Sequence, residues 1–187
     1  MEKTTFDFGF GPVPAHRHAN GGGWVADSAC VADAAFVGQQ AQVYDQARVY
    51  GEAQVYDQAR VYGEAQVYDQ AQVSDQARVY DQARVYDKAW VHGEARVCGE
   101  ARVCDKAWVC DKAWVTTTPL MISGLEYTIT VCDNQVQIGC KTVPATAQLS
   151  ADMFPEAVCP VLRACAHTLI PLIQAHYARV QVEARHD

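Results

Sequence analysis

The chain has 187 residues, a formal net charge of -7 from 15 Lys and Arg against 22 Asp and Glu, and 50% hydrophobic residues. This balance excludes a disordered acidic tail and disfavours a general nucleic-acid binder, because phosphate contacts need a surplus of Lys and Arg. The eight cysteines suggest a disulfide scaffold. However, residues 1–10 show no secretory signal and no stretch is long enough to span a membrane, so we expect a soluble cytoplasmic protein with reduced thiols.

Residues 1–23 are predicted to form an N-terminal cap. Phe6, Phe8 and Phe10 alternate, as in a short strand that covers the exposed core and edge at one end of a repeat array. His16 and His18 form a His-x-His pair between proline and glycine residues. No Cys, Asp or Glu nearby completes a ligand set, so we expect an exposed loop, and neither a metal nor a cofactor.

Internal repetition dominates residues 24–118. Valine recurs every six residues from Val25 to Val115, sixteen times without a miss, and alanine follows four residues later from Ala29 to Ala113. Six residues turn an α-helix by about 600°, so these valines would not share a helical stripe. Six is three times the strand period, and the Asp or Gly two residues after each valine favours a bend. The spacing therefore predicts a β-solenoid with Val and Ala inside.

The Val-x-(Asp/Gly)-x-Ala-x unit resembles the repeat of the hexapeptide-repeat left-handed β-helix family. The resemblance covers about half of the chain. It implies a triangular solenoid in which three units complete a coil of eighteen residues, with the left hand coming from the family and not from the spacing. Fifteen units between Val25 and Val115 then make five coils. We expect a mainly β protein, followed by a small α+β C-terminal region in residues 119–187.

If eighteen residues complete a coil, residues eighteen apart stack on one another, and the outward side chains form three faces. The first face carries one row with Gln42, Arg60, Arg78 and Arg96 and a second with Tyr44, Tyr62, Tyr80 and Cys98. The second face carries Arg48, Gln66, Arg84 and Arg102, beside Tyr50, Tyr68, Tyr86 and Cys104. Seven tyrosines (Tyr44, Tyr50, Tyr56, Tyr62, Tyr68, Tyr80, Tyr86) are therefore predicted to be exposed.

Tyr and Arg dominate binding hot spots, so the first face is a candidate protein-binding surface. Its candidate residues are Tyr44, Arg60, Tyr62, Arg78, Tyr80 and Arg96. The alternative is that such ladders only stabilise a sheet. Both interpretations stay open.

The third face is more apolar. It carries Phe36, Gln54, Gln72, Trp90 and Trp108, beside Tyr56, Ser74, His92 and Cys110. Apolar strips usually mark an interface. Phe36, Trp90, Trp108 and Trp114 are therefore candidates for an oligomer or interdomain contact. Family resemblance favours a homo-oligomer, a dimer or trimer.

Cys98, Cys104 and Cys110 follow at intervals of six, which places them on three different faces. Disulfide bonds among them are excluded, because their side chains diverge, and the spacing is not that of a zinc site. The aspartates of the bends suit tight turns, and this interpretation is favoured over mimicry of nucleic acid.

The periodic valines end before Thr116-Thr117-Thr118-Pro119. Residues 127–140 predict a β-hairpin that turns at Asp133-Asn134, with Ile129, Val131, Val136 and Ile138 as its apolar face. Residues from about 150 to 180 predict a helix with Leu162, Ala166, Leu169, Ile173 and Tyr177 near one side, and Pro160 and Pro171 imply a break or kinks.

Residues from Thr116 onward, with Gly21-Gly22-Gly23-Trp24-Val25, are similar to uncharacterised hexapeptide-repeat proteins of phages and prophages. Our first hypothesis is a non-enzymatic binding or assembly module for a host or phage protein, in one version an inhibitor of host defence. A trimeric acyltransferase with His92 as its base is the second, because the family's enzymes use a histidine. A passive structural spacer is the third. Membrane association is not expected.

Overall fold

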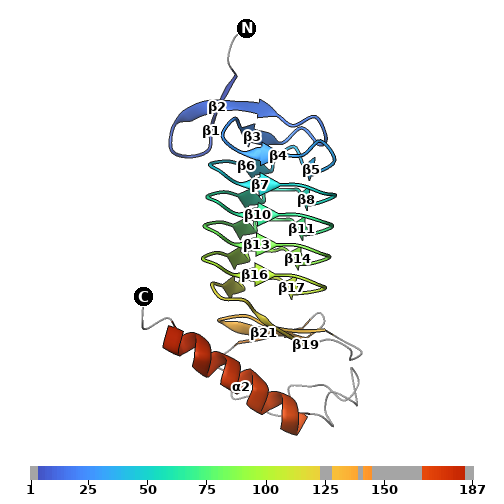
Figure 1. Ribbon diagram of the computed structural model, residues 1–187, viewed down its shortest axis with the longest axis vertical. Helices are drawn as coiled ribbons and strands as arrows, with labels where there is room; N and C mark the ends of the chain where they lie inside the picture. The colour runs from blue at the N-terminus through green and yellow to red at the C-terminus, as the bar shows by residue number, and fades with distance from the viewer. Residues whose placement is uncertain (1–3, 123–127, 139–140, 145–165, 184–187) are drawn as a thin grey trace.

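The computed structural model describes residues 4–122, 128–138, 141–144 and 166–183. The chain forms a β-solenoid of about five coils, with a small antiparallel sheet and one helix at its C-terminal end (Figure 1). The fold predicted from the valine spacing is therefore confirmed, and each coil contributes one short strand to each of three sheets.

The first face is the largest sheet, with eight strands. It contains β1 (Thr5–Asp7), β2 (Pro12–Arg17), β3 (Trp24–Ala26), β6 (Gln42–Val43), β9 (Arg60–Val61), β12 (Arg78–Val79), β15 (Arg96–Val97) and β18 (Trp114–Val115). The second face contains β4 (Cys30–Val31), β7 (Arg48–Val49), β10 (Gln66–Val67), β13 (Arg84–Val85) and β16 (Arg102–Val103). The third contains β5 (Phe36–Val37), β8 (Gln54–Val55), β11 (Gln72–Val73), β14 (Trp90–Val91) and β17 (Trp108–Val109).

The parallel strands of these sheets pair at a constant offset of eighteen residues. Val67 pairs in parallel with Val49 on one side and Val85 on the other, and the same offset recurs on all three faces. The periodic valines from Val37 and the alanines from Ala35 are almost completely buried. Branched Val fills the interior of each strand, while Ala fits where the backbone converges at a corner.

The corners depend on residues that tolerate a left-handed backbone. The second residue after valine has φ between +54° and +59° at eight aspartates and between +62° and +71° at Gly51, Gly63, Gly93 and Gly99. Asp and Gly are the residues for which this conformation is least costly. This confirms the bends expected from their spacing.

The N-terminal segment extends the first sheet instead of merely covering its end. Strand β1 pairs antiparallel with β2, and β2 pairs with β3. Phe8 is buried and its ring lies 4.9 Å from that of Tyr44, whereas Phe10 is 58% exposed. The expected strand therefore includes Phe6 but ends before Phe8.

The exposed loop expected for His16 and His18 is only partly correct, because His16 is exposed but lies in a strand, and His18 lies outside a strand but is buried. His16 belongs to β2, and its Nδ1 lies 3.0 Å from Oδ1 of Asp27. His18 is buried, with Nε2 3.0 Å from the carbonyl oxygen of Ala35. The reason is that the chain reverses after His18 to form β3, which turns this ring towards the first coil.

The C-terminal sheet contains β19 (Leu120–Ile122), β20 (Ile129–Val131), β21 (Gln135–Ile138) and β22 (Lys141–Pro144), in that order. The predicted hairpin is β20–β21, in which Val131 pairs with Val136 across the Asp133-Asn134 turn. Strands β19 and β22 were not predicted.

Helix α2 (Ala166–Glu183) packs Ile173 against the buried Ile129 and Val131. It continues through the exposed Pro171, so the helix does not break there. The predicted helical residues before 166, including Pro160 and Leu162, lie outside the described residues. No helix in the described part of the chain is long and apolar enough to cross a membrane.

Candidate protein-binding surfaces

The six candidate binding residues come together on the first face. Arg78 pairs in register with Arg60 on one side and Arg96 on the other, which makes a row of guanidinium groups along the solenoid. Trp114 pairs with Arg96 and continues this row, with 49% of its surface exposed. The sequence contained the signal for this placement, because 114 is 96 plus one coil of eighteen.

The tyrosines beside this row are less exposed than predicted. Tyr44, Tyr62 and Tyr80 form a stack with ring centroids 4.9 and 5.0 Å apart and planes within 3° of parallel. Each ring covers the face of the next, so Tyr62 and Tyr80 are half-buried, and Tyr44, against which Phe8 packs, is buried. Of the seven tyrosines predicted to be exposed, only Tyr50 reaches that level, at 39%. Burial raises the pKa of Tyr44 to about 12.

The arginines of the first face have no ionic partner in the described part of the chain, where the two close acid–base pairs both involve histidine. Nearby corner aspartates make bonds to the backbone instead. Oδ2 of Asp45 accepts the N–H of Gly63 at 3.1 Å, and Oδ2 of Asp81 accepts that of Gly99 at 3.2 Å. The guanidinium groups of Arg78 and Arg96 are exposed and available to an external acid.

The third face brings together Phe36, Trp90 and Trp108 but not Trp114. The first three lie in one row, in which Trp90 and Trp108 stack with centroids 5.4 Å apart. Trp114 belongs to the first face, where it pairs with Arg96. The C-terminal sheet meets the end of this face, where Oγ1 of Thr130 accepts the backbone N–H of Trp108 at 3.2 Å.

His92 occupies the third face in a setting poorly suited to a general base. Its Nε2 accepts the indole N–H of Trp108, and its Nδ1 faces Oδ2 of Asp75 at 3.8 Å. Burial lowers its pKa, against a smaller opposing effect of Asp75 and Asp111. Both ring nitrogens are therefore engaged, and neither groove described below includes this residue.

The three cysteines of the late coils follow strands of three different sheets, as predicted, and they are free thiols. Cys98 and Cys110 are buried. Burial raises the pKa of Cys110 to about 12 and strongly raises that of Cys132, so neither is an activated nucleophile. No group of potential metal ligands occurs among the residues that the structure describes.

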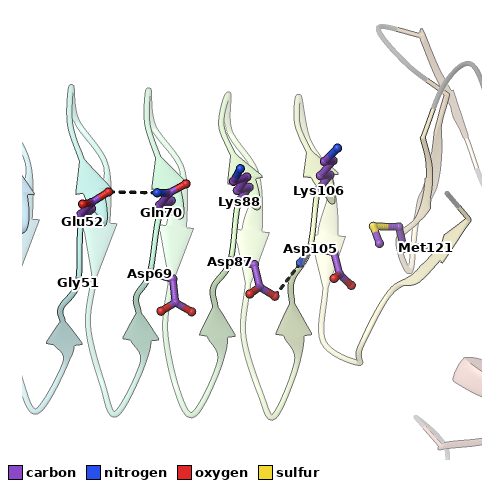
Figure 2. Close-up of a pocket in the computed structure, with 9 residues that line it drawn as sticks. All are labelled: Gly51, Glu52, Asp69, Gln70, Asp87, Lys88, Asp105, Lys106 and Met121. Atoms are coloured by element: carbon purple, nitrogen blue, oxygen red, sulfur yellow. Dashed lines mark hydrogen bonds between the residues drawn. The ribbon is translucent and has the colours of Figure 1, made fainter. Parts of the chain in front are cut away.

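Two open grooves lie on the solenoid, and neither was predicted. The larger, about 880 Å³, follows the corner between the second and third faces. Figure 2 shows Glu52, Gln70, Lys88 and Lys106 in one row and three corner aspartates in another, with Met121 near the C-terminal end. The smaller groove, about 570 Å³, includes Phe36, Gly38 and Tyr56 on the third face.

Comparison with known proteins agrees with the solenoid geometry. Residues 53–69 and 77–93 match the family model described as the YdcK β-solenoid repeat. Neither the curated proteins nor the solved structures give a match. The matched segments lie within the coils, so the similarity supports membership of a β-solenoid repeat family without extending to the C-terminal region.

Proposed function

We propose that the chain is a non-enzymatic protein-binding module whose first face docks an acidic surface of another protein. The observation that carries this proposal is the row Arg60–Arg78–Arg96–Trp114. It combines an exposed indole with three arginines that have no ionic partner among the described residues. Arg and Trp are the residue types most enriched in binding hot spots. The rigid coils hold their spacing before any partner binds, which reduces the ordering cost of association.

The proposed partner is a host or phage protein. The sequence resemblance to hexapeptide-repeat proteins of phages and prophages motivates this choice. The most specific version is an inhibitor that covers the surface of a host defence protein. An acidic patch on that protein would complement the arginine row and speed the encounter.

The test is a pulldown from host lysate with a first-face variant that combines Arg78→Glu, Arg96→Glu and Trp114→Ala. A matched variant on the third face combines Gln54→Glu, Gln72→Glu and Trp90→Ala. We expect the third-face variant to retain a stoichiometric partner and the first-face variant to lose it. A partner retained by the first-face variant, or none retained by the unmodified chain, would contradict the proposal.

A further inference from the structure

The second face carries charges of opposite sign along its two sides. One side has the arginine row Arg48, Arg84 and Arg102, in register on β7, β13 and β16 with Gln66 between them. The other side has the aspartate row Asp69, Asp87 and Asp105, seen in Figure 2. The stack of Tyr50, Tyr68 and Tyr86 lies between the rows, with centroids 4.8 and 4.9 Å apart.

These charges have no close ionic partner among the residues that the structure describes. The described residues contain no ion pair that involves either row. The three aspartates lie about 4.8 Å apart from coil to coil, as do Arg84 and Arg102, and like charges at this spacing repel one another. All three arginines are exposed, as are Asp69 and Asp105. An occupant that supplied the opposite charges would relieve this repulsion.

The other faces do not share this arrangement. On the first face, Gly63 and Gly99 interrupt the corresponding acidic row, and Phe8 packs over Tyr44. The strands of the third face carry no arginine. No described segment packs its aromatic residues on the tyrosines of the second face, where Tyr50 is the most exposed tyrosine.

We propose that the second face is a self-association surface on which a second copy of the chain packs about a twofold axis through the tyrosine row. Rotation by 180° places the arginine row of each copy over the aspartate row of the other. The ionic contacts then form twice, as in an isologous interface. If the solenoids run parallel, Arg84 faces Asp87 and Arg102 faces Asp105. An antiparallel pair does not satisfy the charges, because its twofold axis crosses the rows and places arginine over arginine and aspartate over aspartate.

Sedimentation of the purified chain measures its oligomeric state in the absence of the protein proposed to bind the first face, and so tests self-association alone. We expect a dimer that weakens as salt is raised, since ion pairs are screened. Arg84→Glu with Arg102→Glu should raise the dissociation constant about tenfold or more, because like charges would then face each other. The matched control is Arg78→Glu with Arg96→Glu on the first face, where Arg78-Val79-Tyr80-Asp81 has the same sequence as Arg84-Val85-Tyr86-Asp87. This control should leave the dimer intact.

Cross-linking of the dimer determines its direction in a Cys30→Ser background, which removes an exposed thiol. A parallel pair places Cys104 against its own copy, so mild oxidation should yield a covalent dimer directly. An antiparallel pair places Cys104 near position 50, so Tyr50→Cys should be required. The direct Cys104 cross-link supports the proposal, whereas a cross-link that requires Tyr50→Cys contradicts it. Three other results would overturn it: a monomer at all concentrations, a dimer that both charge variants weaken equally, or a dimer that forms neither cross-link. The pulldown tests partner binding by the first face independently of these results.

Discussion

The backbone N–H of Gly99 donates a hydrogen bond to Oδ2 of Asp81, which lies one coil earlier in the same corner, at 3.2 Å. Asp81 itself has a φ of +57°. We therefore expect Asp81→Ala to lower the free energy of unfolding by about 1–2 kcal/mol, through the lost bond and the strain of alanine in the left-handed region. Asp81→Asn should cost less than half as much, because asparagine tolerates this conformation and keeps an acceptor. Equal losses for the two variants in chemical denaturation would contradict this role of the corner aspartate.

The small residue at position 65 is expected to be essential for packing. Ala65 is completely buried in the Val and Ala core. Ala65→Leu should destabilise the protein by about 1–3 kcal/mol, because the tight interior has no space for the additional carbons. Gln82→Leu, at an exposed corner, is the control and should have little effect on thermal unfolding. An unchanged melting temperature for Ala65→Leu would show that the core is looser than described.

The solenoid could be predicted from sequence because the valine spacing permits only one strand register. With valine at every sixth residue, a shift by one residue would expose the whole apolar row. The same offset of eighteen places Trp114 after Arg96 on the first face, apart from Trp90 and Trp108 on the third.

Exposure was harder to predict than position. An outward direction was correctly assigned to Tyr62, but its burial depends on identical rings one coil above and below it. For the hairpin, alternation predicted the apolar face of β20 and β21. The contacts of Asp133 and Thr130 with the last coil could not be read from a local pattern, since they depend on how two separate units pack.

Removing the carboxylate of Asp133 should loosen the junction between the last coil and the C-terminal sheet. This carboxylate accepts hydrogen bonds from the backbone N–H of Thr116 at 2.7 Å and from its hydroxyl at 2.6 Å. We expect Asp133→Ala to cost about 1.5–3 kcal/mol of stability and to speed hydrogen exchange at the Thr116 amide. Asp133→Asn retains one acceptor oxygen and should show a smaller change. Unchanged exchange at Thr116 in the alanine variant would contradict this anchoring role.

Acidification should weaken the third face through His92. Burial lowers the pKa of His92 in the folded chain, whereas the unfolded chain binds a proton near pH 6.5. As the pH falls below about 6.5 towards the lower pKa of the folded state, the unfolded state therefore takes up the proton first, and the contribution of His92 to stability is progressively lost. We expect the melting temperature of the unmodified chain to fall more steeply over this range than that of His92→Gln. Parallel pH profiles would contradict the assignment.

At alkaline pH, the tyrosine stacks should make the folded protein less stable as the pH rises. Hydrogen bonding with Cys104 and then burial raise the pKa of Tyr86 to about 12, while tyrosine in the unfolded chain ionises near pH 10. The folded state therefore keeps the proton longer, and this contribution to stability is complete below about pH 10 and disappears as the pH rises towards 12.

Cys104→Ala removes the hydrogen bond and should shift the ionisation of one tyrosine towards pH 10 in a titration of tyrosinate absorbance. Cys110→Ala, which alters a thiol on the third face, is the control and should leave the titration of Tyr86 unchanged. If Cys104→Ala leaves the tyrosinate titration where it was, the contact between Tyr86 and Cys104 does not hold the phenol in its neutral form.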